Sequence, residues 1–405
     1  MKIALLSRAM EAEWRQHGPG GGTGSQLAAA IQSAGHEVVV WTHTPGRGKP
    51  ARGKLGSLPA WLIPEKNRIP WCAPIDKFLK WRHGYRKLLT DAFLLRDFLH
   101  SEGPFDVIWA MSEDPDGIAA GWARARGFFS TPLVIMIQAL RYRFANGFTQ
   151  FTNQRNLQQG FNQAARVVAN SPMIMDRLAE SYHVPREKLR WAPHNLTGSF
   201  LKTGPIAAPS PSSDRTILFL GALNEKKGAD VFLQAAEELC RQDNSLLFRM
   251  TGNLTEEGSP FARQWEGLTA RTSIQSRLRL LGHLSAERLI EEILSASVVA
   301  LPSRFDEFSR ATIECLALGT PVVVTDGMGA AHLVREHGSG VVVPAGNASA
   351  LAAGIRSALD TPSYRAAAQQ HQTQIRRNFT PERLAAAWIE ILRDSISAAS
   401  PPGSA

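Results

Sequence analysis

Two carboxylates and a lysine stand at positions suited to binding a phosphorylated sugar. Asp306 and Glu314 lie eight residues apart in LPSRFDEFSRATIECLALGTPVVVTD, and Lys227 stands at the start of GADVFLQAAEEL. A carboxylate can accept two O–H donors at once, which suits sugar hydroxyls, and a lysine suits a phosphate. The same spacing also fits a solvated acid followed by an acid in a helix. The choice therefore depends on the elements that position these residues.

The segment 298–326 predicts a compact βαβ unit. Val298–Leu301 and Val322–Val324 are short apolar runs typical of buried strands. Between them, Ser309 is suited to cap a helix over about Arg310–Leu318, and the following Gly-Thr-Pro ends that helix. The loop and the helix N-terminus then lie at the carboxyl edge of a parallel sheet. That edge is suited to an anion, because backbone N–H groups and the positive helix end meet there.

The run DEFSRATIECLALGTPVV resembles the signature of the retaining glycosyltransferases of family 4, in which an acid, seven residues and a glutamate precede a small-residue helix and G-T-P-V-V. The first acid there is usually Glu; here it is Asp306, and Glu307 is a rival one residue out of register. The resemblance implies that Asp306 holds the donor sugar and Glu314 the ribose. It also implies that a short stretch of backbone binds the diphosphate: Phe308, Ser309 and Arg310.

The stretch 221–228, GALNEKKG, resembles the family's G-R-L-x-x-x-K-G, which opens the first helix of the second domain. The resemblance implies that Gly221 and Lys227 bind the donor, and that Lys227 acts in catalysis with Asp306 and Glu314. Ala222 stands where the family has an arginine on the diphosphate. Three residues could supply the missing cation, and the sequence leaves the choice open: Lys226, Arg304 and Arg310.

A glycine cluster, GPGGGTG at 18–24, follows the first strand, Ile3–Leu6, after an unusually long loop. Glycines let a backbone approach a phosphate closely. A dinucleotide fingerprint needs another glycine register directly on the strand, and an acid after the next strand, so a dehydrogenase is disfavoured. The cluster is similar to the family's first loop, which implies that Gly21 and Gly22 close on the donor.

Two polar residues follow later strands of the first half. Phe105–Met111 precedes Glu113, and Leu133–Ile137 precedes Gln138. The resemblance places Glu113 and Gln138 on the acceptor side, and a histidine often stands at the position of Gln138 in the family. The Asp-x-Asp triplet 114–116 has the form of a metal-binding motif, but its Pro and Gly neighbours favour turn chemistry. We therefore expect no metal and no cofactor.

The chain of 405 residues exceeds one ordinary core, so two domains are expected. With the resemblance, the predicted fold class is α/β, the GT-B arrangement of two doubly wound, Rossmann-like domains facing across a cleft. The predicted boundaries are an acceptor-binding domain over 1–202, a linker over 203–214, a nucleotide-sugar-binding domain over 215–379, a helix over 380–396 that returns to the first domain, and a disordered tail over 397–405.

The charge balance indicates anionic partners. The net charge is +9, and the three cysteines show neither metal nor disulfide spacing, which favours a reducing cytoplasm. No apolar run is long enough to span a membrane, and the first residues indicate a strand rather than a signal peptide. Nucleic acid is disfavoured because no recognition module is present.

A basic, aromatic segment from about Trp61 to Lys87 suits an anionic membrane surface, which would make the protein peripheral on the inner face of the membrane. The basic residues that precede this segment are expected on a loop: Arg47, Lys49, Arg52 and Lys54. Within the segment, the apolar residues after Pro74 have helical spacing. The competing interpretation is an ordinary surface helix.

The sequence thus predicts a retaining, metal-independent hexosyltransferase. Its expected substrates are a nucleoside diphosphate sugar and a glycan or lipid-linked acceptor, in cell-surface polysaccharide or glycolipid synthesis. Two alternatives remain open: a nucleotide-sugar epimerase of the same fold, and a non-enzymatic basic binding protein.

Overall fold

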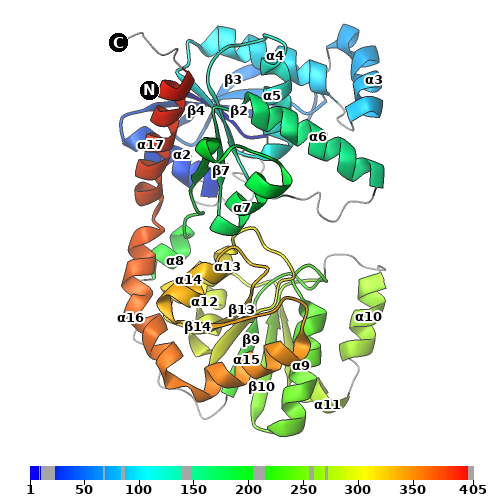
Figure 1. The fold of residues 1–405 in the computed structure, drawn as a ribbon, viewed down its shortest axis with the longest axis vertical. Coiled ribbons are helices and arrows are strands. Elements are labelled where there is room, and N and C mark those ends of the chain that lie inside the picture. Colours follow the sequence, from blue (N-terminus) through cyan, green and yellow to red (C-terminus); the bar gives the residue numbers. More distant parts are fainter. Residues whose placement is uncertain are drawn as a thin grey trace. The chain divides into compact units, whose positions relative to one another are not determined.

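Backbone contacts divide the chain into two units, one formed by Met1–Thr197 with the C-terminal residues from Pro381 and the other by Gly198–Thr380. The structure is a computed structural model, shown in Figure 1. It describes residues 1–8, 10, 23–66, 69–83, 87–138, 140, 147–203, 215–254, 260–269 and 272–399. Gly21, Gly22 and residues 204–214 of the predicted linker lie outside the described residues.

The first unit is built on an eight-stranded sheet in the order β3-β4-β2-β1-β5-β6-β7-β8. Neighbouring strands are parallel except for β3, which runs antiparallel to β4. The strand order reverses between β1 and β5, which lie side by side at its centre. The strands are β1 (Lys2–Leu6), β2 (Glu37–Thr44), β3 (Ala51–Leu55), β4 (Leu58–Pro64), β5 (Val107–Ala110), β6 (Leu133–Met136), β7 (Arg166–Ala169) and β8 (Leu189–Trp191).

The hairpin β3–β4 corrects the expectation of a loop before Trp61. Arg52 and Lys54 lie on β3, whereas Arg47 and Lys49 precede it. The hairpin forms because Leu55 and Leu58, on either side of a two-residue turn, are both buried. The Gly and Pro residues of this stretch favoured a loop, so this short strand was not predicted.

Helices cover this sheet, and α17 returns from the far end of the chain to pack on α2 (Figure 1). There Trp388 of α17 meets Trp109 of β5, with ring centroids 4.4 Å apart. The helices are α2 (Thr23–Ser33), α3 (Ala73–His83), α4 (Leu88–Glu102), α5 (Ile118–Arg124), α6 (Gly147–Gln163), α7 (Pro172–Ser181) and α17 (Pro381–Ala399), with single turns η1 (Pro70–Cys72), η2 (Glu113–Gly117) and η4 (Arg186–Lys188). The expected tail thus has its first residues, 397–399, inside α17.

The second unit has a six-stranded, all-parallel sheet in the order β11-β10-β9-β12-β13-β14. The order reverses between β9 and β12. The strands are β9 (Arg215–Phe219), β10 (Leu246–Thr251), β11 (Leu278–Gly282), β12 (Val298–Leu301), β13 (Val322–Thr325) and β14 (Gly340–Val343). The helices are α8 (Gly198–Lys202), α9 (Ala229–Gln242), α10 (Pro260–Thr269), α11 (Thr272–Gln275), α12 (Ala286–Ser295), α13 (Arg310–Ala317), α14 (Ala331–His337), α15 (Ala348–Asp360) and α16 (Pro362–Asn378).

The apolar residues of these strands explain their burial. All four residues of β12 and of β13 are buried, as expected for parallel strands covered by helices on both faces. Phe219 and Phe248 belong to a core on one face together with Phe232 of α9 and Ile355 of α15. Each unit is therefore a doubly wound α/β sheet, and the predicted fold class is confirmed. Among the described helices, none is both long and apolar enough to cross a bilayer.

Candidate active site

The site in the second unit lies where the strand order reverses, at the carboxyl ends of β9 and β12. Ligands of doubly wound sheets bind at this position. Backbone hydrogen bonds join the loops here: Arg304 N–H donates to the Lys226 carbonyl (2.9 Å), and Asp306 N–H donates to the Gly327 carbonyl (3.0 Å). Gly329 N–H in turn donates to the Asp306 carbonyl (2.8 Å). Three loops, following β9, β12 and β13, are thereby held in one layer around Asp306.

Gly228 allows the first two of these loops to approach each other. Its φ of 70° lies in the left-handed region, and a Cβ at this position would come within 2.0 Å of the Pro302 carbonyl oxygen. A side chain is therefore excluded on both counts. The preceding residue, Lys227, is thereby brought against the loop that carries Asp306.

Lys227 and Asp306 form an ion pair, with Nζ 2.5 Å from Oδ2. The lysine backbone is fixed by Asn224, whose Oδ1 accepts from Lys227 N–H at 2.9 Å. Its aliphatic stem lies beside Gly221, where an added Cβ would come 3.6 Å from Lys227 Cβ and Cγ. The structure thus brings Asp306 to the segment of Gly221 and Lys227, which lies far from it in the sequence.

The ion pairs distinguish the three candidates for the missing cation. Arg304 binds both carboxylate oxygens of buried Asp230 (2.8 and 2.6 Å), and these bonds raise the pKa of Arg304. Lys226 Nζ lies 3.6 Å from Oε2 of buried Glu307. Arg310 is exposed at the start of α13 and forms no ion pair within the described ranges. Arg304 and Lys226 are thus held by buried carboxylates, and Arg310 is the exposed candidate without an ion pair among the described residues.

Ser309 occupies the predicted capping position of α13 but does not cap it. Its φ and ψ are 74° and 88°, and its side chain makes no capping hydrogen bond. Instead Ser309 Oγ accepts from Thr312 Oγ1 at 3.0 Å. A non-glycine residue in this conformation costs on the order of 1–3 kcal/mol, and such strain gathers at functional sites. The helix that follows ends at Ala317, one residue earlier than predicted.

The backbone expected to face a diphosphate is only partly available. Phe308 N–H donates to Asp306 Oδ1 at 3.3 Å, and the Phe308 ring is buried, with its centroid 6.1 Å from that of Phe379. The next N–H groups, of Ser309 and Arg310, open the helix, where N–H groups have no intrahelical acceptor. These two positions remain suited to an anion.

Glu314 lies on α13, one turn after Arg310, and is partly buried. Burial raises the pKa of this carboxyl group, and the positive charge of Arg310 opposes that rise. Among the described residues, none donates a hydrogen bond to it. A carboxylate that is desolvated in this way is ready to accept hydroxyl donors from a ligand.

In the first unit, the two predicted acceptor-side residues meet. Gln138 N–H, after β6, donates to Oε2 of buried Glu113 at 2.8 Å. The Asp-x-Asp triplet lies in the single turn η2, where Asp116 is buried and its Oδ2 accepts from Ser112 Oγ at 2.9 Å. In the part of the chain that the structure describes, no cluster of His, Cys, Asp and Glu could hold a metal ion.

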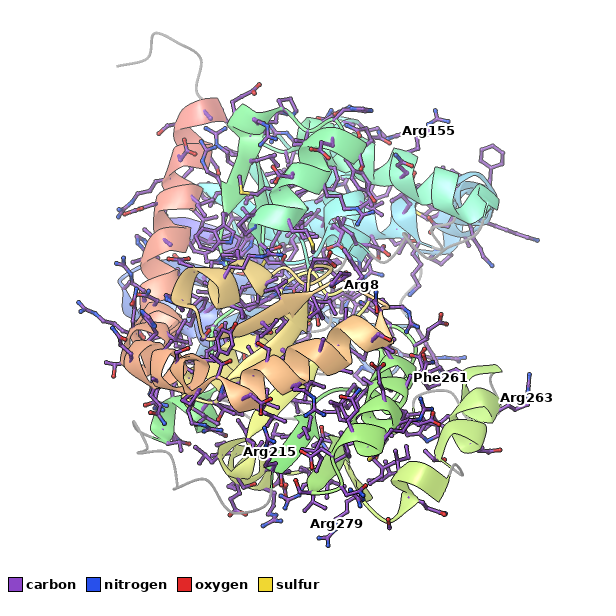
Figure 2. The ribbon with its side chains drawn as sticks, turned by 60° about the horizontal axis from the view of Figure 1, so that its bottom comes forward. Arg8, Arg155, Arg215, Phe261, Arg263 and Arg279 are labelled. Carbon is purple, nitrogen blue, oxygen red and sulfur yellow. The ribbon has the colours of Figure 1, made fainter. Side chains whose placement is uncertain are left out.

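A polar cluster that sequence reasoning missed surrounds Arg8, which is labelled in Figure 2. Arg8 follows β1, and its Nη2 lies 2.7 Å from Oδ2 of buried Asp91. Its backbone N–H donates to Asp116 Oδ2 at 3.4 Å. Burial, with the charges of Arg8 and Lys87, lowers the pKa of His43 to about 3. The cluster lies at the carboxyl edge where the order of this sheet reverses. The only signal in the sequence was an arginine directly after the first strand.

Comparisons with known proteins identify the family. Residues 206–375 match the family model described as "Glycosyl transferases group 1", and residues 25–194 match "Glycosyltransferase Family 4". The chain belongs to the group 1, family 4 glycosyltransferases. The resemblance read from the motifs is therefore confirmed, and the protein is a glycosyltransferase.

Curated relatives carry related names. The chain is 27% identical over 390 residues to D-inositol 3-phosphate glycosyltransferase of Thermobispora bispora, covering 91% of this chain and 88% of the relative. It is 24% identical over 247 residues to alpha-D-kanosaminyltransferase of Streptomyces kanamyceticus, covering 58% of this chain and 63% of the relative. Both names denote sugar transfer, and the first also names inositol 3-phosphate.

Solved structures share the fold at low identity. Sucrose-phosphate synthase from Thermosynechococcus elongatus matches with a TM-score of 0.70 at 20% identity, covering 98% of this chain and 100% of that one. Anabaena HepE in complex with UDP matches with a TM-score of 0.69 at 17% identity, covering 97% and 100%. Both match nearly the whole chain, as expected for a GT-B glycosyltransferase.

Proposed function

We propose that this glycosyltransferase moves a hexose from a nucleoside diphosphate sugar to a hydroxyl acceptor, with retention at the anomeric carbon and without a metal. The observation that carries the proposal is the Lys227–Asp306 pair beside the start of α13, at the carboxyl ends of β9 and β12. It combines a cation for phosphate with an acid for hydroxyls at the edge where doubly wound sheets bind nucleotides.

Each group has a role in binding the donor. Lys227 turns from Asp306 toward the diphosphate, and the N–H groups of Ser309 and Arg310 bind the same phosphates. Asp306, released from the lysine, accepts hydroxyls of the sugar. Glu314 accepts the ribose hydroxyls. The Arg310 guanidinium supplies the second cation that Ala222 cannot provide.

The reaction follows from this arrangement. The bond between the anomeric carbon and the diphosphate oxygen breaks, and its electron pair leaves with the phosphate. The acceptor hydroxyl attacks the same face of the sugar, and its proton passes to the departing phosphate oxygen. Lys227 and Arg310 stabilise the charge that develops on that oxygen, so no enzyme nucleophile and no cofactor is required.

The acceptor is a glycan or a lipid-linked sugar in cell-surface polysaccharide or glycolipid synthesis, and it binds to the first unit. Support comes from the polar edge formed by Arg8, Glu113 and Gln138 at the ends of β1, β5 and β6. We place the enzyme in the cytoplasm, because its cysteines are free and buried. Inositol 3-phosphate, named in the curated relatives, is the small acceptor to compare.

A thermal-shift screen followed by a transfer assay tests this proposal. The screen uses nucleoside diphosphate sugars, beginning with UDP-glucose because Anabaena HepE was solved with UDP-glucose. Binding at about 100 times Kd stabilises a protein by about 2.7 kcal/mol. The donor that shifts the melting temperature is then incubated with lipid-linked, glycan and polyol acceptors.

Product analysis separates the alternatives. NMR of the product reports the anomeric configuration, and inversion would refute the mechanism. Isomerisation of the donor sugar without acceptor would favour an epimerase. Binding of donors with no turnover of any acceptor would favour a binding protein. Activity should survive EDTA, whereas complete loss that manganese restores would show that a metal is needed.

A further inference from the structure

We propose that the first unit docks on anionic lipid bilayers through an exposed aromatic face on η1 and α3, formed by Trp71, Ile75 and Phe78. This inference goes beyond sugar transfer and does not depend on it, because the face contains none of the candidate active-site residues. A bilayer interface accepts amphipathic aromatic side chains beside cations.

The exposed apolar residues are concentrated in this segment. Trp71 is 58% exposed, Ile75 45% and Phe78 54%, and they fall within eight residues of each other. Two other large apolar side chains are this exposed in the described parts of the chain, Trp191 and Leu280, and each stands by itself. Intervals of four and three residues put the three side chains on one helical stripe. A contiguous exposed apolar patch marks a surface for interaction.

The face is not a consequence of a loosely attached helix. The neighbouring stripe of the same segment, Cys72, Asp76 and Leu79, is buried. Asp76 binds the start of α4, accepting from Leu89 N–H at 2.8 Å and from Thr90 Oγ1 at 2.5 Å. The orientation of α3 is thus fixed, and its apolar stripe is held outward.

Aromatic rings extend the face onto α4 and the segment that follows α5. Trp71 packs edge-on against Phe93, with ring centroids 4.7 Å apart, and Phe93 packs edge-on against Phe128 at 5.1 Å. The Arg96 guanidinium lies over the Phe93 ring at 4.7 Å. Rings bordered by cations are typical of surfaces that sit at the headgroup level of a bilayer.

The charge of the surroundings selects an anionic surface. Residues 70–87 contain five Lys or Arg and one acid, Asp76, which is used inside the fold. Lys77 and Lys80 are exposed on α3. Arg155 points outward from α6, on which α3 packs (Figure 2). Lysine and arginine near acidic lipid attract it within a Debye length.

The structure also corrects the extent of the basic surface expected from the sequence. Lys87 is half-buried and donates to the Glu65 carbonyl, and its charge acts on buried His43. Trp61 lies on β4 and is only partly exposed. The side chains of Trp81, Arg82 and Arg86 lie outside the described residues. The docking surface is therefore assigned to 71–80 with its aromatic neighbours.

The docking surface is joined to the polar edge of the sheet through α4. Asp76 of α3 binds Thr90, and the next residue, Asp91, pairs with Arg8. The helix that carries the aromatic face is thus one contact away from the cluster to which we assign the acceptor. Docking would bring a lipid-linked acceptor to the correct edge of the unit.

Vesicle flotation tests the proposal on the full chain without substrates. The vesicles are phosphatidylcholine alone or phosphatidylcholine mixed with phosphatidylglycerol, at low and high salt. We expect binding that requires phosphatidylglycerol and weakens with salt. Phe78→Ser should weaken it about tenfold. Lys77→Gln with Lys80→Gln should weaken it by a further factor of about 5 to 30.

Matched variants control for loss of apolar surface and of charge. Leu280→Ser removes an equally exposed apolar side chain elsewhere, and Lys49→Gln with Lys54→Gln removes two exposed lysines from the hairpin region. Both should float like the parent chain, and melting temperatures should stay unchanged because every altered side chain is exposed.

Three results would overturn the proposal. One is equal recovery with neutral and acidic vesicles. Another is equal loss of flotation in the control variants. The third is a dimer of the parent chain that Phe78→Ser dissociates without any flotation, which would make the aromatic face a subunit interface.

Discussion

Replacing Glu314 with glutamine should impair donor use and stabilise the empty protein at the same time. The carboxylate is desolvated in α13, receives no hydrogen bond from the described residues and has Arg310 as its charged neighbour. A glutamate with a purely structural role would be expected to receive a hydrogen bond when its carboxylate is desolvated. Glutamine has nearly the same shape and carries no charge, so the substitution separates electrostatics from packing.

Both magnitudes follow from hydrogen-bond energetics. A charge-assisted bond to a ribose hydroxyl is worth about 1.5–3 kcal/mol, so its loss should lower kcat/KM for the donor about 10- to 150-fold. An ion buried without bonds costs about 1–3 kcal/mol, and Glu314 is only partly buried, so neutralising it should gain about 1 kcal/mol. For a unit of this size, that raises Tm by about 2–4 °C.

The pH dependence gives an independent check. Because burial raises the pKa of Glu314 in the folded state, the folded protein holds this proton to a higher pH than the unfolded chain does. The carboxyl group therefore costs nothing below its unfolded pKa, and its cost grows as the pH rises through the folded pKa. The Tm advantage of Glu314→Gln should be present at neutral pH and vanish in acid.

Calorimetry across pH and donor kinetics on the same preparations provide the measurements. Glu336→Gln is the matched control, because Glu336 is an exposed glutamate of the same unit and should change neither quantity. Unchanged donor kcat/KM in Glu314→Gln would refute the assignment to the ribose. A lower Tm of Glu314→Gln would refute the inference that the desolvated carboxylate destabilises the folded unit.

The remaining predictions concern the charged residues around this site and in the first unit. Lys227→Gln should weaken nucleoside diphosphate binding about 10- to 100-fold in titration calorimetry, since a charge-assisted contact is lost; unchanged affinity would remove Lys227 from the donor site. Arg304→Gln should cost about 2–3 kcal/mol in denaturant unfolding, because buried Asp230 loses its partner. Arg310→Gln should cost much less, since Arg310 only offsets the burial of Glu314 without an ion pair, and should raise the donor KM; the opposite pattern would exchange their roles. The pKa of His43 is lowered to about 3, so the unfolded chain takes up a proton that the folded one refuses, and stability should fall between about pH 6.5 and 3. His43→Gln should reduce that fall, and an identical pH profile would contradict it.

Much of the fold could be predicted, because parallel strands leave a simple pattern. Val298–Leu301 and Val322–Val324 are uninterrupted apolar runs, and the structure places β12 and β13 on them. The hairpin β3–β4 escaped because Arg52 and Lys54 lie on an exposed edge strand, where alternation is weak. The stretch after Pro74 with helical spacing forms two helices, α3 and α4, and Asp76 of α3 binds the start of α4.

The contacts among the predicted site residues could not be read from the sequence. Spacing and resemblance identified Lys227 and Asp306, yet no rule of sequence says that they pair across two loops. The same holds for Arg8, which follows β1 without any motif and is bound by Asp91 from a helix far along the chain. Contacts between distant segments depend on strand order, and strand order is a property of the folded sheet.

The missing arginine at Ala222 shows why partners matter more than residue types here. By composition, Lys226, Arg304 and Arg310 were equivalent substitutes. In the folded unit, Arg304 holds Asp230 with two hydrogen bonds, and Lys226 faces Glu307. Removing Arg304 would leave the buried Asp230 carboxylate uncompensated, which costs more than a surface contact with phosphate returns, and moving Lys226 would break its ion pair with buried Glu307. Arg310 forms no ion pair among the described residues and opens the helix at whose N-terminus we propose that the diphosphate binds, so a diphosphate could recruit it at little cost.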